Sequence, residues 1–217
     1  MGWLDLIGFL TTGVLAGLLA GLFGVGGGVI VVPALILNFG HLGIGGDWVA
    51  HLAVGTSLAA IVGTGAASAA AHHRRGGVRW DLVLRLAPGI VLGAWAGAGL
   101  AGQIPESWLR RVFALFLVYV GLTMLRGARG GHPRQLPGAL GLAGTGAVIG
   151  AVSALVGIGG GTLTVPYLSA RAVPLRQAVG TSAACGLPIA IAGAAGFVMV
   201  GLGRAGLPDW SSGFVYW

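Results

Sequence analysis

Long apolar stretches that contain hardly a charge recur along the chain, and they limit what it can fold into. Trp48–Ala71 and Leu82–Ala101 are two examples. Roughly 20 apolar residues in succession are enough for a helix to cross the hydrocarbon core of a bilayer. A strand of a transmembrane barrel would instead alternate apolar and polar residues. The pattern therefore predicts an all-α, polytopic membrane protein surrounded by lipid.

The scarcity of charge supports this prediction. Only 8% of the 217 residues are charged, whereas soluble chains carry about 25%. So few charges could not cover a water-facing surface. The 12 basic residues are all Arg, and they lie in short loops rather than on one helix face. This distribution is typical of membrane topology signals and argues against nucleic-acid binding.

The order of segments and charges predicts an orientation. If each apolar segment crosses the membrane once, the loops after the second, fourth and sixth segments carry eight of the 12 Arg residues. Because basic loops stay in the cytoplasm, this count predicts a cytoplasmic N-terminus. The predicted segments are Trp3–Leu37, Trp48–Ala71, Leu82–Ala101, Trp108–Leu125, Gly138–Ala170 and Val173–Leu202, followed by the tail Gly203–Trp217.

An internal repeat divides the chain into two related halves. Gly13–Leu37 and Gly146–Ala170 are identical at ten of 25 positions, and the sequence AVGTS occurs at Ala53–Ser57 and again at Ala178–Ser182. Repeats of this size are common in secondary transporters. We expect a first membrane repeat over residues 1–130 and a second over 131–217. Two segments of the second repeat are missing, which predicts that this chain is part of a longer protein.

Each repeat contains a glycine cluster that should interrupt a helix. A Gly inside a helix costs about 1 kcal/mol relative to Ala, and four of the five residues at positions 24–28 are Gly. Backbone groups freed inside a membrane must face protein, water or a ligand, and the start of a half-helix favours an anion. The alternative is close helix packing by small residues. The substrate-binding candidates in the two clusters are Gly24, Gly26, Gly27, Gly28, Pro33, Gly157, Gly159, Gly160, Gly161 and Pro166.

Hydroxyl side chains recur at matched positions near these clusters. Hydroxyl groups can donate to an anion, or they can bond to a carbonyl one turn earlier in their own helix. The further substrate-binding candidates are Thr56, Ser57, Thr162, Thr181 and Ser182. His51 and Arg176, each two residues before AVGTS, are candidates for an access route or for coupling; otherwise they are interfacial side chains.

The sequence gives little support for catalysis. It has no His/Glu metal cluster, no paired carboxylates inside an apolar segment and no spacing typical of a Ser-His-Asp set. A phosphate-binding loop would need GK[ST] after its glycines, and neither cluster has it. We therefore expect no enzyme activity, no cofactor and no metal.

Four segments resemble the TauE/SafE sulfite exporter family, also called the TSUP transporters. They are Gly21–Leu35, Ala53–Leu58, Ala154–Leu168 and Ala178–Ala183. The resemblance implies about eight membrane segments and transport of small sulfur-containing or related organic anions across a bacterial inner membrane. Substrates differ within that family. The alternative is a membrane protein that does not transport, such as an assembly factor or an enzyme-associated subunit.

Overall fold

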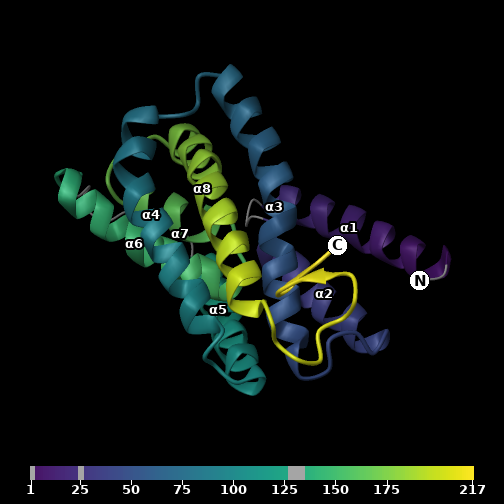
Figure 1. The fold of residues 1–217 in the computed structure, drawn as a ribbon. Coiled ribbons are helices and arrows are strands. Elements are labelled where there is room, and N and C mark those ends of the chain that lie inside the picture. Colours follow the sequence, from purple (N-terminus) through teal and green to yellow (C-terminus); the bar gives the residue numbers. More distant parts are fainter. Residues whose placement is uncertain (1–2, 24–26, 127–134) are drawn as a thin grey trace.

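The computed structural model describes residues 3–23, 27–126 and 135–217. The regular secondary structure of this part is helical apart from a short C-terminal β-hairpin (Figure 1), so the predicted all-α membrane fold is confirmed. Five of the described helices, α3 to α6 and α8, are long and apolar enough to cross a membrane. The elements are α1 (Trp3–Phe23), α2 (Gly28–His41), the 3-10 turn η1 (Gly46–Trp48), α3 (Val49–Arg74), α4 (Trp80–Ala101), α5 (Glu106–Arg126), α6 (Ala139–Val156), α7 (Gly161–Ser169), α8 (Leu175–Gly201), β1 (Ser211–Ser212) and β2 (Val215–Tyr216).

Helices α1 and α2 form a helical hairpin, and so do α6 and α7. The rings of Phe9 and Phe39 lie 6.1 Å apart, near the outer ends of α1 and α2. The Thr145 hydroxyl on α6 lies 3.0 Å from the Tyr167 hydroxyl on α7. Each contact joins residues on opposite sides of a glycine cluster, so the second helix of each pair returns beside the first.

This return corrects one premise of the orientation prediction. The first and fifth apolar segments do not each cross the bundle once, because the chain turns back within each of them. Both ends of each hairpin therefore lie on the same face of the bundle. One hairpin opens toward the start of α3 and the other toward the start of α8.

Helices α3 and α8 pack against each other in opposite directions. A Cβ added at Gly55 would lie 3.2 Å from the Cβ atom of Phe197, and a Cβ added at Gly193 would lie 3.0 Å from a methyl of Leu58. As the residue number increases along α3, the residue number of its contact partner on α8 decreases. The pair is antiparallel.

Helix α4 packs closely along α6, and these two helices run in the same direction. Added Cβ atoms at Gly89, Gly93 and Gly97 would overlap the α6 backbone at residues 143, 147 and 151 in turn. Small residues at intervals of four let two helix backbones approach closely inside a membrane. This seam joins the two predicted repeats.

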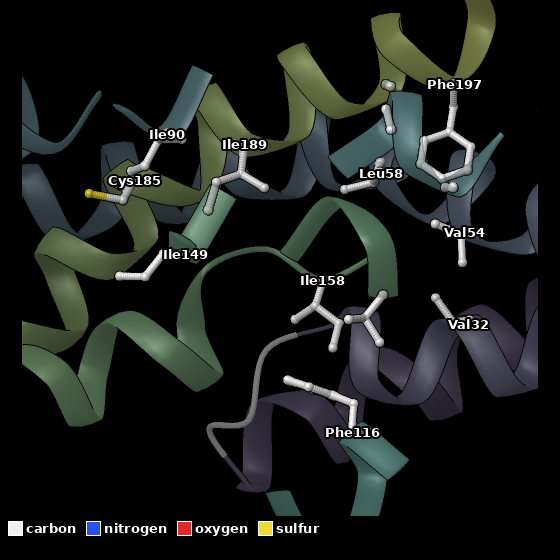
Figure 2. Packing of buried hydrophobic residues seen from close by; sticks show 14 of the residues in the cluster. Val32, Val54, Leu58, Ile90, Phe116, Ile149, Ile158, Cys185, Ile189 and Phe197 are labelled. Carbon is white, nitrogen blue, oxygen red and sulfur yellow. The ribbon is translucent and has the colours of Figure 1, made fainter. Parts of the chain in front are cut away.

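The connection between α6 and α7 lies inside the core rather than at its edge. Figure 2 shows Ile158 on this connection, within the buried cluster that also contains Val32, Val54 and Ile189. Large apolar side chains such as Leu84, Leu92 and Leu115 are instead exposed on the outer surface. A lipid environment accommodates such a surface, whereas water would not.

Candidate functional site

The second glycine cluster forms the predicted break. Helix α6 ends at Val156, and α7 begins at Gly161. Gly157 has φ 72°, a left-handed conformation that residues with a Cβ rarely adopt. The chain between these helices is therefore non-helical, as the cost of glycine in a helix predicts.

The first cluster is described only in part. Gly24 and Gly26 lie outside the described residues, whereas Gly27 precedes α2 and Gly28 is its first residue. A Cβ added at Gly28 would overlap the carbonyl of Gly157 and lie 2.7 Å from the Cα atom of Ile158. The start of α2 therefore packs directly against the turn between α6 and α7. Glycine at position 28 is required because any side chain would separate these two backbones.

Ser57 ties helix α3 to the same turn. Its buried hydroxyl donates a hydrogen bond of 2.9 Å to the carbonyl of Gly157. A carbonyl released from a helix inside a membrane is costly unless it is paired. Ser57 therefore stabilises the break.

Thr56 and Thr181 hold two chain segments in the same way at opposite ends of the α3–α8 pair. The Thr56 hydroxyl accepts a 2.9 Å hydrogen bond from the backbone N–H of Tyr216, while Gly55 packs against the carbonyl of Phe214. In the second AVGTS, the Thr181 hydroxyl accepts a 3.0 Å hydrogen bond from the N–H of Arg79, and Gly180 packs against the carbonyl of Gly77. In both cases the carbonyl that packs against the glycine belongs to the residue two positions before the one whose N–H donates to the threonine.

Four hydroxyl groups near the second break are buried and lack a hydrogen-bond partner among the described residues. They are the hydroxyls of Ser153, Thr162, Thr164 and Ser182. Ser153 precedes the break by one turn, and Thr162 and Thr164 lie in the first turn of α7. Gly160 packs closely between this turn and α8. A Cβ added at Gly160 would lie 3.2 Å from the Thr164 hydroxyl and 3.6 Å from the Ser182 carbonyl oxygen.

Some of the backbone N–H groups at this break are already paired, whereas the four hydroxyls have no partner among the described residues. The N–H groups of Leu163 and Thr164 donate to the carbonyl of Gly160, and the N–H of Gly161 donates to that of Gly159. Unpaired buried hydroxyls are costly, and such groups need an explanation such as a bound ion or water. Sequence reasoning made Thr162 and Ser182 binding candidates, noted Thr164 only as a polar residue in the second repeat, and missed Ser153. The signal that singles out Thr164 is that its equivalent in the first repeat, Val31, is apolar.

Of the remaining predicted site residues, Pro166 shares α7 with Thr162 and Thr164, whereas His51 and Arg176 lie in other parts of the bundle. Pro33 and Pro166 lie inside α2 and α7, past the first turn of each helix. Arg176 is exposed and donates to the carbonyl of Arg75. His51 is fully buried at the opposite end of the bundle.

Comparison with known proteins identifies the family. The family described as "Sulfite exporter TauE/SafE" matches residues 9–217, nearly the whole chain. The chain belongs to this family. No solved structure matches it significantly.

Relatives of the TauE/SafE chain come from bacteria and archaea. It is 36% identical to a probable membrane transporter protein of Haemophilus influenzae over 209 residues, which is 95% of this chain and 79% of that protein. A probable membrane transporter protein of Xylella fastidiosa is 34% identical over 82% of this chain and 68% of its own length. One from Methanocaldococcus jannaschii is 30% identical over 78% of this chain and 64% of its own length. The chain is thus a member of a family of membrane transporters.

Proposed function

We propose that this protein is a secondary transporter of small anions, with sulfite and related sulfonates as the substrate class. The observation that carries the proposal is that four buried hydroxyls around the second break lack a partner among the described residues: Ser153 on α6, Thr162 and Thr164 on α7, and Ser182 on α8. Each hydroxyl can donate one hydrogen bond to an oxyanion. The start of a helix adds the positive end of its dipole.

Neutral donors suit transport better than a buried cation would. Hydrogen bonds to a charged ligand contribute about 1.5–3 kcal/mol each. A few of them bind an anion without holding it permanently. The hydroxyls lie beside a non-helical turn inside the bundle, where a transporter is expected to bind its substrate.

The matched contacts of Thr56 and Thr181 support alternating access by two inverted halves. Both threonines hold a segment that follows a long helix, and the two helices run antiparallel. A twofold axis in the membrane plane would exchange the two arrangements, as in transporters with inverted repeats. In this mechanism each threonine closes one face, and releasing one hydrogen bond opens that face to the hydroxyl site.

The hairpins also change the proposed orientation in the cell membrane. With both hairpins returning to their own face, seven of the described Arg residues lie on the face where α3 ends: Arg74, Arg75, Arg79, Arg85, Arg126, Arg171 and Arg176. Three described Arg residues, Arg110, Arg111 and Arg204, lie on the other face. Because basic residues remain in the cytoplasm, we propose that α1 begins, and the C-terminal hairpin lies, on the outer side.

Transport by the purified protein in proteoliposomes tests the proposal, with labelled sulfite and labelled sulfoacetate as probes. Thr164→Val removes one hydroxyl with almost no change in shape, and Ser182→Ala removes another. Thr64→Val is the matched control, because the Thr64 hydroxyl bonds to the carbonyl of Ala60 in its own helix and is exposed. A lost bond of about 1.5–3 kcal/mol raises KM by roughly 10- to 150-fold.

A measurement of thermal stability distinguishes a rise in KM caused by a lost substrate contact from one caused by misfolding. Replacing an unpartnered buried hydroxyl by an apolar group should leave the folded protein as stable as before or more so. We therefore expect Thr164→Val to melt at or above the wild-type temperature while its KM rises. An unchanged KM in both hydroxyl variants contradicts the site. No uptake of either probe by the wild-type protein contradicts the substrate class.

A further inference from the structure

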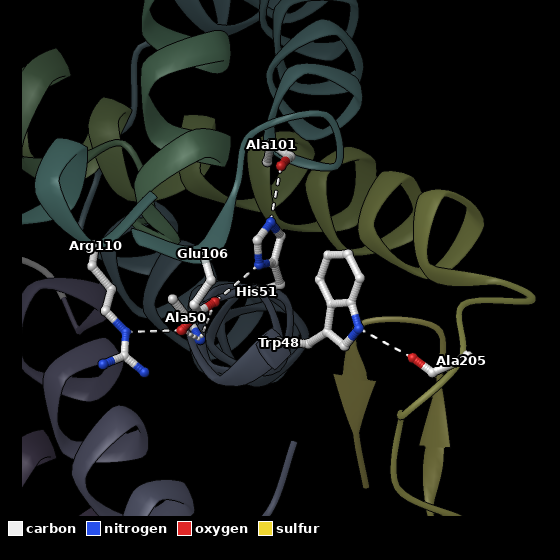
Figure 3. Close-up of polar contacts among 7 residues, drawn as sticks. All are labelled: Trp48, Ala50, His51, Ala101, Glu106, Arg110 and Ala205. Carbon is white, nitrogen blue, oxygen red and sulfur yellow. Dashed lines mark hydrogen bonds and ion pairs between the residues drawn. The ribbon is translucent and has the colours of Figure 1, made fainter. Parts of the chain in front are cut away.

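We propose that His51 and Glu106 form a proton-binding site that couples anion transport to proton movement. The inference rests on the proposed transport function but concerns different residues, at the opposite end of α3 from the Arg-rich loop. Figure 3 shows the arrangement, in which His51 lies between the start of α5 and the end of α4.

Both ring nitrogens of His51 face hydrogen-bond acceptors. Nδ1 lies 3.2 Å from Oε2 of Glu106, and Nε2 lies 3.0 Å from the carbonyl oxygen of Ala101. A neutral imidazole has one N–H and one lone pair. These two contacts are satisfied together when Nε2 carries one hydrogen and a second hydrogen lies between Nδ1 and Oε2 of Glu106.

Glu106 has the contacts of a carboxylate. Its oxygens accept hydrogen bonds from the backbone N–H of Ala50, at 2.9 and 3.1 Å, and from Nε of Arg110, at 2.8 Å. A protonated carboxyl would lose acceptor capacity at these donors. The geometry thus leaves room for one exchangeable proton between Nδ1 of His51 and Oε2 of Glu106.

The groups around this pair come from several elements. Arg110 on α5 is the only other charged side chain that bonds to it within the described residues. The end of α4 contributes a backbone carbonyl, while Trp48 and Phe214 pack their rings against the His51 ring at 5.1 and 5.0 Å. Asp47 and Arg204 line the adjoining cavity without bonding to the pair.

Water can reach the carboxylate but not the imidazole. Glu106 lines a cavity of about 670 Å³ that opens on the face where α3 begins. Its side chain is 18% exposed, whereas that of His51 is 0% exposed. A proton from this cavity reaches Nδ1 through the carboxylate, as in a proton relay.

Loss of the proton would disturb the start of α3. The Nδ1 lone pair would then face a carboxylate oxygen, so the ring and Glu106 would separate. Glu106 also binds the N–H of Ala50, and α3 carries Ser57 six residues beyond His51, where it holds the break carbonyl of Gly157. One helix therefore connects the proton site to Ser57, about 9 Å away along its axis, and Ser57 in turn bonds to the break beside the proposed substrate site.

The test compares two transport modes of the full chain in proteoliposomes, with labelled sulfoacetate as the probe and the membrane potential clamped. One mode is accumulation driven by a pH gradient, and the other is counterflow against unlabelled sulfoacetate, which needs no net proton movement. We expect His51→Gln and Glu106→Gln to lower the ratio of the first rate to the second by tenfold or more. His41→Gln, an exposed histidine at the end of α2 on the same face, should keep the wild-type ratio.

The outcomes separate this inference from the proposed function. Wild-type counterflow without accumulation in a pH gradient overturns the proton site but leaves the transporter intact. A wild-type ratio in both His51→Gln and Glu106→Gln overturns it as well. Absence of counterflow in the wild type with both sulfoacetate and sulfite contradicts the proposed function itself. Because the wild-type measurement is decisive alone, failure of either variant to fold does not leave the inference untested.

Discussion

Substitution of Gly28 by Ala should separate the start of α2 from the turn between α6 and α7. The added Cβ would lie 2.7 Å from the Cα atom of Ile158, whereas ordinary contacts begin at 3.4 Å. The backbones must therefore move apart by at least roughly 0.7 Å. Overpacking of this kind typically costs about 1–3 kcal/mol.

Gly27→Ala provides a control one residue away. A Cβ at Gly27 would meet no atom within 4 Å. Its φ of −55° and ψ of −40° are also favourable for alanine. We expect this variant to fold and to transport like the wild type.

Thermal unfolding followed by tryptophan fluorescence, together with transport in proteoliposomes, measures both effects. For a chain of this size, 1 kcal/mol shifts the melting temperature by roughly 2–4 °C, so Gly28→Ala should melt roughly 2–12 °C lower. It should also transport poorly, because the displaced turn carries the hydroxyl site. If Gly28→Ala melts and transports like Gly27→Ala, the two breaks do not touch and the reasoning fails.

Three further substitutions test other contacts. Ser57→Ala leaves a buried carbonyl unpaired and should lower the stability by about 1–3 kcal/mol; an unchanged melting temperature would show that the carbonyl finds another partner. Gly93→Val should prevent close packing of α4 on α6 and abolish monodisperse protein in detergent, whereas Gly99→Val, with no atom within 4 Å, should not; equal behaviour would contradict the seam. Thr181→Val should speed hydrogen exchange at the Arg79 amide about fivefold to tenfold, as expected for a bond of about 1 kcal/mol, while Thr181→Ser should not; equal exchange in both would remove that bond from the mechanism.

The sequence was sufficient for the properties that depend on local composition. Apolar length and missing charge predicted membrane helices, because a bilayer acts on each segment separately. The glycine cluster predicted the break at Gly157–Gly160, because the cost of glycine in a helix is also local. The doubled motifs identified the TauE/SafE family for the same reason, since they are read directly from the chain.

The sequence could not decide the direction of the chain after a break. A flexible turn allows the chain either to continue across the bundle or to turn back. The contact between the Thr145 and Tyr167 hydroxyls stabilises the arrangement in which it turns back. The return leaves both ends of each hairpin on one face, and the orientation that we propose from the Arg-rich loops differs for this reason from the one expected from the sequence. Local pattern alone therefore predicted the position of the break but not its consequence for topology.

Tertiary structure also decided which hydroxyls and charges have partners. Thr56 and Ser57 are adjacent in sequence, yet one holds a C-terminal segment and the other a carbonyl 100 residues away. The partner of His51 is Glu106, 55 residues further along the chain. The physical reason is that a hydrogen bond depends on the position of both groups, whereas the sequence fixes the chemistry of each group separately.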